Sequence, residues 1–509
     1  MPGTAAFPGP APRSPGHGRS ARGAGMTVPR VLVIGGGISG LATAWWLSRL
    51  GIPVELWEAA GRAGGKIRSR RTGGYLCEQA AGLLVNFRPE VDQLVREAGL
   101  EPARRGRSDD LRRYVLHGGA LAEVPMRLPA MALSPLWSLR GKLRLLAEVA
   151  IPREPAEDES VARFIRRRLG AEILETAIDP FVSGTLAADP EQASADAVLP
   201  RLKALEHRYG SITLGMLVNR VLKRRRANRA DTFSFQGGMG ALIQALAANP
   251  GIRLRTGVRA LGLERMANGW RVEGEADGKR IRAEAAQLLI STPADEAARL
   301  LSPLDRRLAN LLSGIDYAPL AVVHLGMRRD RVRHPLDGTG FLVPRRARCG
   351  FNGNLWMSTL FPGRAPAGRV LLTSYLGGVR DPGAAERSDR QLQGQLLRDL
   401  APLLGLTGDP EYLRVDRHPR GLPLYHGDYQ QRCREITRLA AVQPGLHLGA
   451  NYLGGVSVRE RLHQGMLCAD RIAAGLRHPP ATRRLHPMSR CRESLAVASG
   501  GCTRGNGGD

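Results

Sequence analysis

The chain has 509 residues, of which 43% are hydrophobic and 24% are charged, and its formal net charge is +27. This content of apolar residues excludes a largely disordered chain, and the length exceeds the ~250–300 residues at which one hydrophobic core stops growing. We therefore predict a globular protein of two or three domains.

The positive charge is only a weak indication of a partner. Five of the 74 basic residues are lysines, and such an excess of arginine is typical of GC-rich coding. Clustered basic residues favour nucleic acid or an anionic membrane as partners. The densest cluster is the run Lys223 to Arg226, and no aromatic residue is interleaved with it to stack on bases. We therefore predict that the protein does not bind nucleic acid.

The cysteines indicate the redox compartment. The chain has six cysteines and no CxxC pair, which argues against a disulfide framework and against a zinc site. We expect a reduced, cytoplasmic compartment and no metal ion. The sequence also lacks a run of ~18 apolar residues with suitable flanks, so we predict no transmembrane helix.

Both ends of the chain lack the periodicity of folded elements. Residues 1–25 are rich in Pro, Gly, Ala and Arg and contain no apolar segment of the secretory type. We predict a disordered leader; an over-assigned start codon before Met26 and a transit peptide are the alternatives. Residues 478–509 are predicted to be a disordered tail.

The first patterned segment predicts a strand, a glycine-rich turn, a helix and a second strand. Apolar runs at 31–34 and 54–57 flank a stretch with helical spacing at 41–50. The turn between the first strand and the helix consists of Gly35, Gly36, Gly37, Ile38, Ser39 and Gly40, a GxGxxG pattern.

This turn is typical of dinucleotide binding. Gly35 permits the tight turn, Gly37 lets the backbone approach a pyrophosphate, and Gly40 allows close packing of the helix, whose N-terminus attracts the anion. Glu58 ends the second strand, where its carboxylate can accept hydrogen bonds from ribose hydroxyls.

The residues after Glu58 favour FAD over NAD. The stretch from Glu58 and Ala59 through Arg62 to Lys66 has the pattern E-x-x-x-R-x-G-G-K, which flavoproteins of the glutathione-reductase and amine-oxidase type carry. Arg62 and Lys66 can neutralise the pyrophosphate, and Gly64 and Gly65 let the chain pass close to the flavin ring. Near the other end of the chain, residues 449–458 form a glycine-containing turn before a predicted helix. We expect the two segments to bracket one FAD site.

Between these segments the pattern changes twice. Residues 110–210 are mostly helical in spacing, short strands return at 252–290, and residues 317–376 alternate as in a half-buried sheet. We predict an α/β fold in which a Rossmann-like FAD-binding domain is interrupted by a helical insertion and a mixed-sheet substrate domain. The predicted ranges are 26–90, about 230–295 and 430–477 for the FAD domain, 91–210 for the insertion, and 211–229 with 296–429 for the substrate domain.

From about Arg30 to Leu476 the sequence resembles the protoporphyrinogen oxidase family, flavoenzymes of haem synthesis related to the amine oxidases. The similar stretches are the two flavin segments, Arg113–Gly119 with Leu121 and Pro125, Ser160–Gly170, Asp179–Glu191, Phe235–Met239 and Leu422–Tyr425. The helical stretch that ends at Asp189-Pro190-Glu191 is the most specific, since general amine oxidases lack it.

The resemblance implies further FAD contacts. By the family's pattern, Val258 contacts the adenine through its backbone, Gly82 lies at the flavin, and Asn451, Val456, Ser457 and Val458 belong to the closing flavin segment. One departure is that Glu78 is followed by Gln79-Ala80-Ala81-Gly82, whereas the family usually has Gly-Pro after the acidic residue. The arginine that some members carry just after Gly-Pro to face a substrate propionate is missing, and Arg88 is out of register.

The resemblance also implies the chemistry. A porphyrinogen is a flexible macrocycle with acidic side arms, and its oxidation removes hydride from a methylene bridge to flavin N5, with oxygen or another acceptor taking the electrons. Aromatisation drives the reaction, so the protein mainly positions the ring and excludes water. We therefore name no catalytic acid or base. The alternatives are oxidation of coproporphyrinogen III by the same chemistry and a carotenoid-type desaturase.

Two features test rival functions. Amine oxidases usually place a lysine near the flavin from the sheet domain, and this chain has no lysine after Lys279. Residues 499–502 resemble a covalent flavin-attachment motif but lie in the predicted tail, so we expect FAD to be held non-covalently.

Residues 125–146 combine leucines, methionines and Trp137 with Arg127, Arg140, Lys142 and Arg144. This composition suits either an anionic membrane surface or a packing surface within the insertion. We expect a cytoplasmic monomer or homodimer that can attach peripherally to the inner face of the cell membrane.

Overall fold

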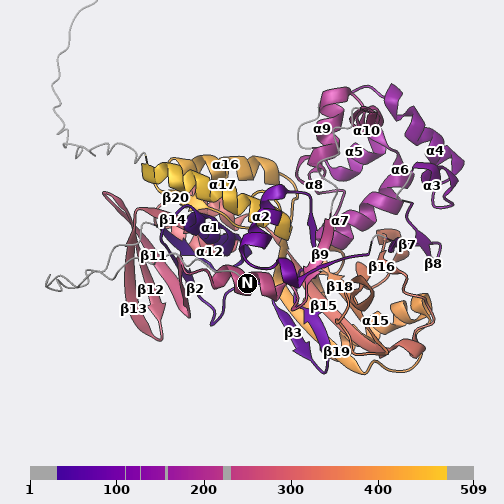
Figure 1. Cartoon of the computed structure of the whole chain (residues 1–509). Coiled ribbons are helices and arrows are strands. Elements are labelled where there is room, and N and C mark those ends of the chain that lie inside the picture. The colour runs from indigo at the N-terminus through magenta and orange to yellow at the C-terminus, as the bar shows by residue number, and fades with distance from the viewer. Residues whose placement is uncertain (1–30, 109, 126–127, 155–158, 222–230, 478–509) are drawn as a thin grey trace, which may run out of the picture.

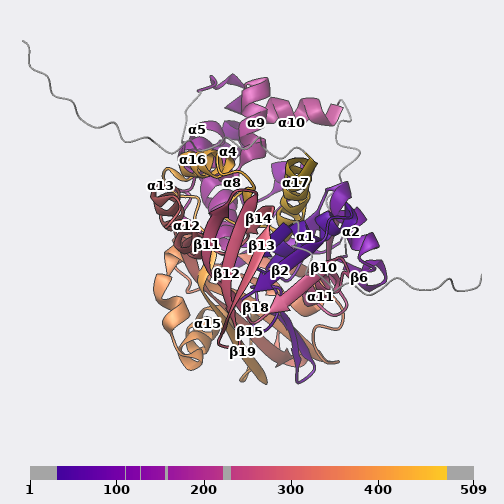
Figure 2. The same cartoon turned by 90° about the vertical axis from the view of Figure 1, so that its left-hand side faces the viewer.

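The structure is a computed structural model that describes residues 31–108, 110–125, 128–154, 159–221 and 231–477 (Figures 1 and 2). The predicted leader at 1–25, the predicted tail at 478–509 and the basic run at 223–226 lie outside the described residues. In Figure 1 the nucleotide half of the molecule is on the left, a helical region is at the upper right and a large sheet is at the lower right.

A parallel sheet of five strands forms the centre of the nucleotide half. Its order is β10-β2-β1-β14-β20, and every neighbouring pair is parallel. The strands are β1 (Val31–Ile34), β2 (Val54–Glu58), β10 (Ile252–Thr256), β14 (Gln287–Ile290) and β20 (Leu446–Leu448). All four residues of β1 are buried, because both faces of the sheet are covered.

The alternation of side chains along β1 divides the core between two layers. Val31 and Val33 face α1 (Ile38–Arg49), α11 (Gly240–Ala247), α17 (Val458–Arg477) and α2 (Pro89–Glu97). Leu32 and Ile34 face the opposite layer. That layer contains the antiparallel strands β11 (Val258–Met266), β12 (Gly269–Ala276) and β13 (Lys279–Ala285), together with α12 (Ala294–Leu301), α13 (Arg306–Ser313) and α16 (Tyr429–Ala441).

The second half contains a sheet of seven strands in the order β19-β15-β18-β17-β16-β7-β8. They are β7 (Arg112–His117), β8 (Ala120–Glu123), β15 (Tyr317–Arg328), β16 (Gly338–Leu342), β17 (Gly353–Trp356), β18 (Arg369–Gly377) and β19 (Tyr412–Pro423). One face packs on α15 (Asp389–Leu404), which buries leucines at 392, 396, 400 and 404 against it. These four positions repeat every four residues, as one stripe of a helix requires.

The helical region lies between β8 and β9 in the chain and has a core of its own. Its helices are α3 (Leu128–Leu133), α4 (Leu139–Leu146), α5 (Val161–Arg168), α6 (Ala171–Ile173), a π-helical turn (Leu174–Ile178), α7 (Asp179–Leu186), α8 (Ala195–Val198), α9 (Pro200–Tyr209) and α10 (Ile212–Val221). Of the two alternatives that the sequence left open for residues 125–146, Trp137 follows the packing surface within the insertion. Its side chain is 6% exposed and donates from Nε1 to Thr176 Oγ1 at 2.8 Å.

Two boundaries differ from the ranges expected from the sequence. β7 and β8 fall within the expected helical insertion, yet they extend the seven-stranded sheet by parallel pairing of β7 with β16. Most of α12 and all of α13 fall within the expected substrate domain, yet they pack on the nucleotide sheet. The first difference arises because β16, the parallel partner of β7, is distant in sequence, so local periodicity does not reveal the pairing.

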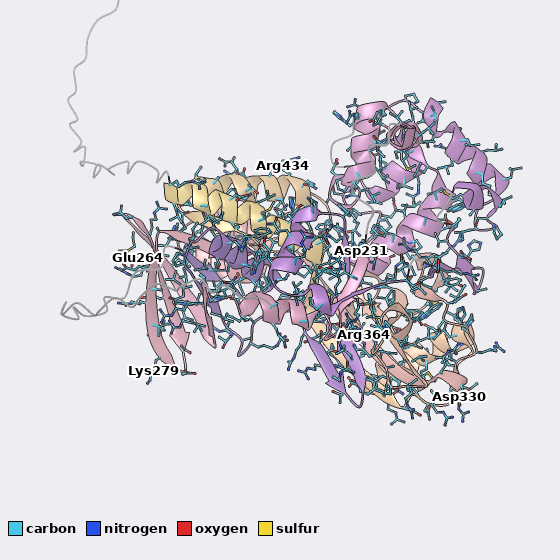
Figure 3. The ribbon with its side chains drawn as sticks, viewed as in Figure 1. Asp231, Glu264, Lys279, Asp330, Arg364 and Arg434 are labelled. Atoms are coloured by element: carbon cyan, nitrogen blue, oxygen red, sulfur yellow. The ribbon has the colours of Figure 1, made fainter. Side chains whose placement is uncertain are left out.

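A buried ion pair joins the two halves, and its arginine, Arg364, is labelled in Figure 3. Arg364, from the loop before β18, is 1% exposed and contacts the carboxylate of Glu78 at the end of β4 (Tyr75–Glu78). Its second nitrogen donates to Ser234 Oγ of β9 (Asp231–Phe235) at 2.6 Å. Glu78 also accepts from Ser69 Oγ of β3 (Ser69–Thr72) at 2.6 Å and from the backbone of Met239 at 3.0 Å. β9 itself pairs with β5 (Leu84–Asn86) and β6 (Arg104–Gly106), so the junction is fixed from several segments.

Candidate functional site

A cavity of about 420 Å³ opens at the carboxyl ends of β1, β2 and β14. This is the edge at which parallel sheets bind their ligands. Its walls come from segments that are far apart in the sequence: 34–39, 57–59, 64–67, 80–81, 258–260, 291–300, 420–422 and 450–461.

The glycine-rich turn forms the floor of this cavity. Gly35 has a φ of 104°, and a Cβ there would lie 2.8 Å from Ser291 O. A Cβ at Gly40 would lie 2.0 Å from Gly35 O, whereas a Cβ at Gly37 would meet no atom within 4 Å. Gly37 therefore leaves open space beside the first turn of α1. The residues fit a diphosphate group, because this cradle and the helix N-terminus offer backbone N–H groups without a side chain in the way.

Glu58 is held in place by backbone donors. Its carboxylate accepts from Gly36 N at 2.7 Å and from Ala60 N at 2.8 Å, and it lines the cavity. Ala59 lines the cavity beside it. That the Glu58 carboxylate accepts hydrogen bonds from ribose hydroxyls stays a prediction. The fixed orientation of the carboxylate suits it to accept them.

The second glycine pair lies against the first turn. Gly64 N donates to Gly36 O at 2.7 Å, and a Cβ at Gly65 would lie 3.3 Å from the Cα of Gly37. Gly64 has a φ of 110°, which favours glycine. Both glycines line the cavity, as do Ile38 and Ser39 of the first turn.

The guanidinium of Arg62 contacts its own loop. Its guanidinium donates to the carbonyl oxygens of Ala63 at 3.0 Å and Gly65 at 2.8 Å, and Arg62 is absent from the lining of the cavity. In this structure it fixes the loop that carries the glycine pair, and a contact of Arg62 with a pyrophosphate stays a prediction. The sequence pattern locates the arginine but does not show where its side chain points.

Lys66 does line the cavity. Its Nζ donates to Gly421 O at 2.6 Å and lies 5.5 Å from the centre of the Tyr317 ring. Burial, and next the nearby charge of Arg420, lower the pKa of Lys66 to about 8. Lys66 thereby joins the flavin loop to the end of β19.

The C-terminal segment closes the cavity at the start of α17. Asn451, Val456 and Val458 line it, whereas Ser457 does not and accepts from Glu460 N at 3.3 Å. Arg461 stabilises this turn from α17, because its guanidinium donates to Ala450 O at 2.5 Å and to Leu453 O at 2.7 Å.

Two predicted contacts from the family pattern differ in outcome. Val258 lines the cavity, as expected of a residue at the adenine end. Gly82 does not, since it is buried against Met357, whose Cε would lie 3.0 Å from an added Cβ. Ala80 and Ala81 take that place in the wall.

The sequence interpretation missed two parts of the wall. One follows β14 and consists of Ser291, Thr292 and Pro293 with Glu296 and Arg299 of α12. The other is Arg420, Gly421 and Leu422 at the end of β19. The sequence did carry a signal for the segment after β14. A buried strand that precedes a helix, as β14 does, ends at the same edge of a parallel sheet as β1.

Comparison with known proteins identifies the family. The model of the flavin containing amine oxidoreductases matches residues 38–473. The chain belongs to this family. It is an FAD-dependent oxidoreductase, which confirms the cofactor expected from the sequence.

Individual relatives agree with the resemblance found in the sequence. The mitochondrial protoporphyrinogen oxidase of Nicotiana tabacum is 30% identical over 479 residues, which cover 88% of this chain and 95% of that protein. The coproporphyrinogen III oxidase of Bacillus subtilis is 28% identical, and the matched region covers 86% of this chain and 96% of that protein. A crystal structure from Exiguobacterium sp. 255-15, named provisionally as a protoporphyrinogen oxidase, has a TM-score of 0.73 and 23% identity, and it covers 88% of this chain and 100% of its own.

Proposed function

We propose that this flavoprotein oxidises protoporphyrinogen IX to protoporphyrin IX in haem biosynthesis. The observation that carries the proposal is the flavin cavity with its glycine cradle and Glu58, in a chain whose relatives over most of its length are porphyrinogen oxidases. Bound FAD supplies a two-electron acceptor that oxygen or another oxidant regenerates.

The role of the chain's own residues is to bind the cofactor and to position the reacting ring. The first turns of α1 and α17 line the cavity and place the positive ends of their helix dipoles beside it, and Glu58 is oriented for hydroxyl groups. Lys66 and Arg420 add positive charge at the end of β19. Most of the wall is apolar, which excludes water from the reacting ring. We assign no residue as a catalytic acid or base.

The reaction is tested by following porphyrin fluorescence after mixing purified holoenzyme with protoporphyrinogen IX. We expect a rate well above that of spontaneous oxidation without enzyme. A rate equal to that control would contradict the proposal and leave the flavoprotein fold intact.

Coproporphyrinogen III is the second candidate substrate, because relatives from B. subtilis and Staphylococcus aureus carry the name coproporphyrinogen III oxidase. The same assay with this substrate distinguishes the two by the ratio of their kcat/KM values. We further propose that FAD is held non-covalently. Acid precipitation should then release the yellow chromophore, and colour that stays with the pellet would disprove it.

We propose that the helical region attaches the protein to the cytoplasmic face of the cell membrane. None of the described helices has the length and hydropathy needed to span a bilayer. Leu139, Leu143 and Leu146 of α4 are instead 73%, 56% and 69% exposed, and their spacing places them on one side of the helix. Leu133 of α3 is 85% exposed. Arg140 is exposed next to them and suits an anionic headgroup.

Flotation with anionic vesicles tests the attachment. We expect the wild type to float with the vesicles and the L139D/L143D variant to stay at the bottom. The control is Val442→Asp, because Val442 is 62% exposed at the C-cap of α16, outside the helical region. If the wild type does not float, or if both variants float equally, the attachment through α4 is wrong.

A further inference from the structure

A groove runs between α15 and the turn that joins β7 to β8. It consists of two hollows of about 630 and 550 Å³ that share Arg398 and Asp399 of α15. The opposite walls are the β7–β8 turn with its two glycines and the segment 346–350 that follows β16. No residue of this groove lines the flavin cavity.

The first hollow has an apolar wall. Leu116, Ala347, Pro402 and Leu403 line it together with the half-buried Cys349. The turn at Gly118 and Gly119 adds no side chain, so the hollow is open on that side.

His117 gives this apolar hollow a hydrogen-bond donor. Arg346 Nη2 lies 2.8 Å from His117 Nδ1. A guanidinium has no acceptor, so Nδ1 must accept, and the neutral ring then carries its proton on Nε2. Arg346 is itself oriented by Glu175 at 3.0 Å.

The second hollow is basic. Arg348, Arg390 and Arg398 line it, and none of the three forms an ion pair within the part of the chain that the structure describes. The neighbouring groups are already engaged, because Asp399 accepts from Gly350 N at 2.6 Å and Arg387 pairs with Asp381. Three guanidinium groups and a single carboxylate without an ion pair among the described residues, that of Asp399, line this concave site, so the hollow keeps an excess of positive charge and favours an anion with more than one acidic group.

We propose that this groove is a second binding site, for an amphiphilic polycarboxylate. The apolar body of the ligand lies against Leu116 and Leu403, and its carboxylates pair with Arg348, Arg390 and Arg398. The aromatic product of the proposed reaction, an apolar ring with acidic side arms, has this chemistry. The identity of the ligand therefore rests on the proposed function, and the site would retain the product on the enzyme after it leaves the flavin cavity.

The test is the number of protoporphyrin IX molecules that the holoenzyme binds in equilibrium dialysis. We expect two per chain in the wild type. In R390E/R398E, binding at one site should weaken at least tenfold while turnover of the porphyrinogen is unchanged, because both arginines are exposed on α15. Leu403→Asp should weaken the same site. The matched control is Arg280→Glu, an exposed arginine on β13 of the nucleotide half.

The outcomes separate this proposal from the proposed function. One porphyrin per chain in the wild type, or a second site that survives in R390E/R398E, would overturn the groove as a product site. Full displacement by inorganic pyrophosphate with no effect of Leu403→Asp would overturn it in favour of a simple anion site. If R390E/R398E no longer floats with vesicles but still binds two porphyrin molecules, the groove is a lipid contact instead of a product site. Failure of the proposed function appears separately, as the absence of porphyrinogen turnover.

Discussion

At the scale of single residues, the glycines of the 35–40 turn set how closely a ligand approaches the backbone. A Cβ at Gly40 would lie 2.0 Å from Gly35 O, so Gly40→Ala must displace α1 or the turn. We expect FAD affinity to fall at least tenfold, about 1.4 kcal/mol, because the N–H groups at the helix start move with it. The measurement is the ratio of flavin to protein absorbance after dialysis.

Gly61→Ala is the matched control for this substitution. A Cβ at Gly61 meets no atom within 4 Å, and its φ lies outside the left-handed region. This variant should keep its flavin. Equal flavin loss in both variants would show that the packing at Gly40 is not what supports binding.

The charge of Lys66 should make FAD binding depend on pH. Burial, then Arg420, lower the pKa of Lys66 in the free protein to about 8. If the ammonium faces the FAD pyrophosphate, binding raises that pKa and takes up a proton. The affinity is then constant below about pH 8 and falls as the pH rises above it, by at most about tenfold per pH unit.

Titration of FAD fluorescence quenching at several pH values measures this effect. Lys66→Arg should bind with little change up to about pH 10, since a guanidinium stays charged. Lys66→Met should bind more weakly and without pH dependence. A wild-type Kd that is the same at about pH 7 and at about pH 10 would show that Lys66 does not contact the anion.

At the scale of elements, the helical region is held together by a buried ion pair. Arg168 of α5 contacts Glu148, and both side chains are fully buried. Glu148 also accepts from the backbone of Ile212 and Thr213 at 3.0 Å, which fixes the start of α10. Arg168→Met leaves a buried carboxylate without its cation, and we expect it to lower the free energy of unfolding by about 3–5 kcal/mol.

Urea unfolding of Arg168→Met and Arg163→Met provides the comparison. Arg163 is 63% exposed and pairs with Glu154 at 3.2 Å, so its loss should cost less than about 1 kcal/mol. Burial acts to raise the pKa of Glu148, but hydrogen bonds from Ser211, Thr213 and Ile212 lower it below its usual value. The contribution of the carboxylate is therefore present above its ordinary pKa and is lost as the pH falls through the lowered one. Equal losses in the two variants would refute the role of burial.

The elements that the sequence predicted correctly are those with strong local patterns. The strands at 31–34 and 54–57 and the helix between them are present as β1, β2 and α1. The hairpin of β7 and β8 was missed, although Gly118 and Gly119 are a turn signal, because helical spacing dominates the residues that follow. Its parallel partner β16 lies more than 200 residues away, where no local pattern can indicate the pairing.

At the scale of the whole molecule, the flavin site is assembled from segments between residues 34 and 461. An unfolded chain cannot bring them together, so FAD binds only the folded state. At a free FAD concentration of about 100 times Kd, the free energy of unfolding should rise by about 2.7 kcal/mol. Urea unfolding of the apoprotein with and without FAD measures this difference.

Riboflavin is the control ligand, because it lacks the pyrophosphate and the adenosine that the 35–40 turn and Glu58 are proposed to hold. It should stabilise the protein much less than FAD at the same concentration. If riboflavin and FAD stabilise equally, the nucleotide half of the cavity does not contribute to binding.

The sequence by itself determined the flavin turn, Glu58 and the second glycine pair, because their function depends on spacings of a few residues along one strand–turn–helix unit. The tertiary structure decided which side chains face the cavity. It placed Ser291 to Pro293 and Arg420 to Leu422 in the wall, turned Arg62 toward its own loop and buried Gly82 against Met357. Apart from the local contacts of Arg62, these outcomes depend on the packing of elements that lie hundreds of residues apart, and the direction of a side chain is fixed only when that packing is complete.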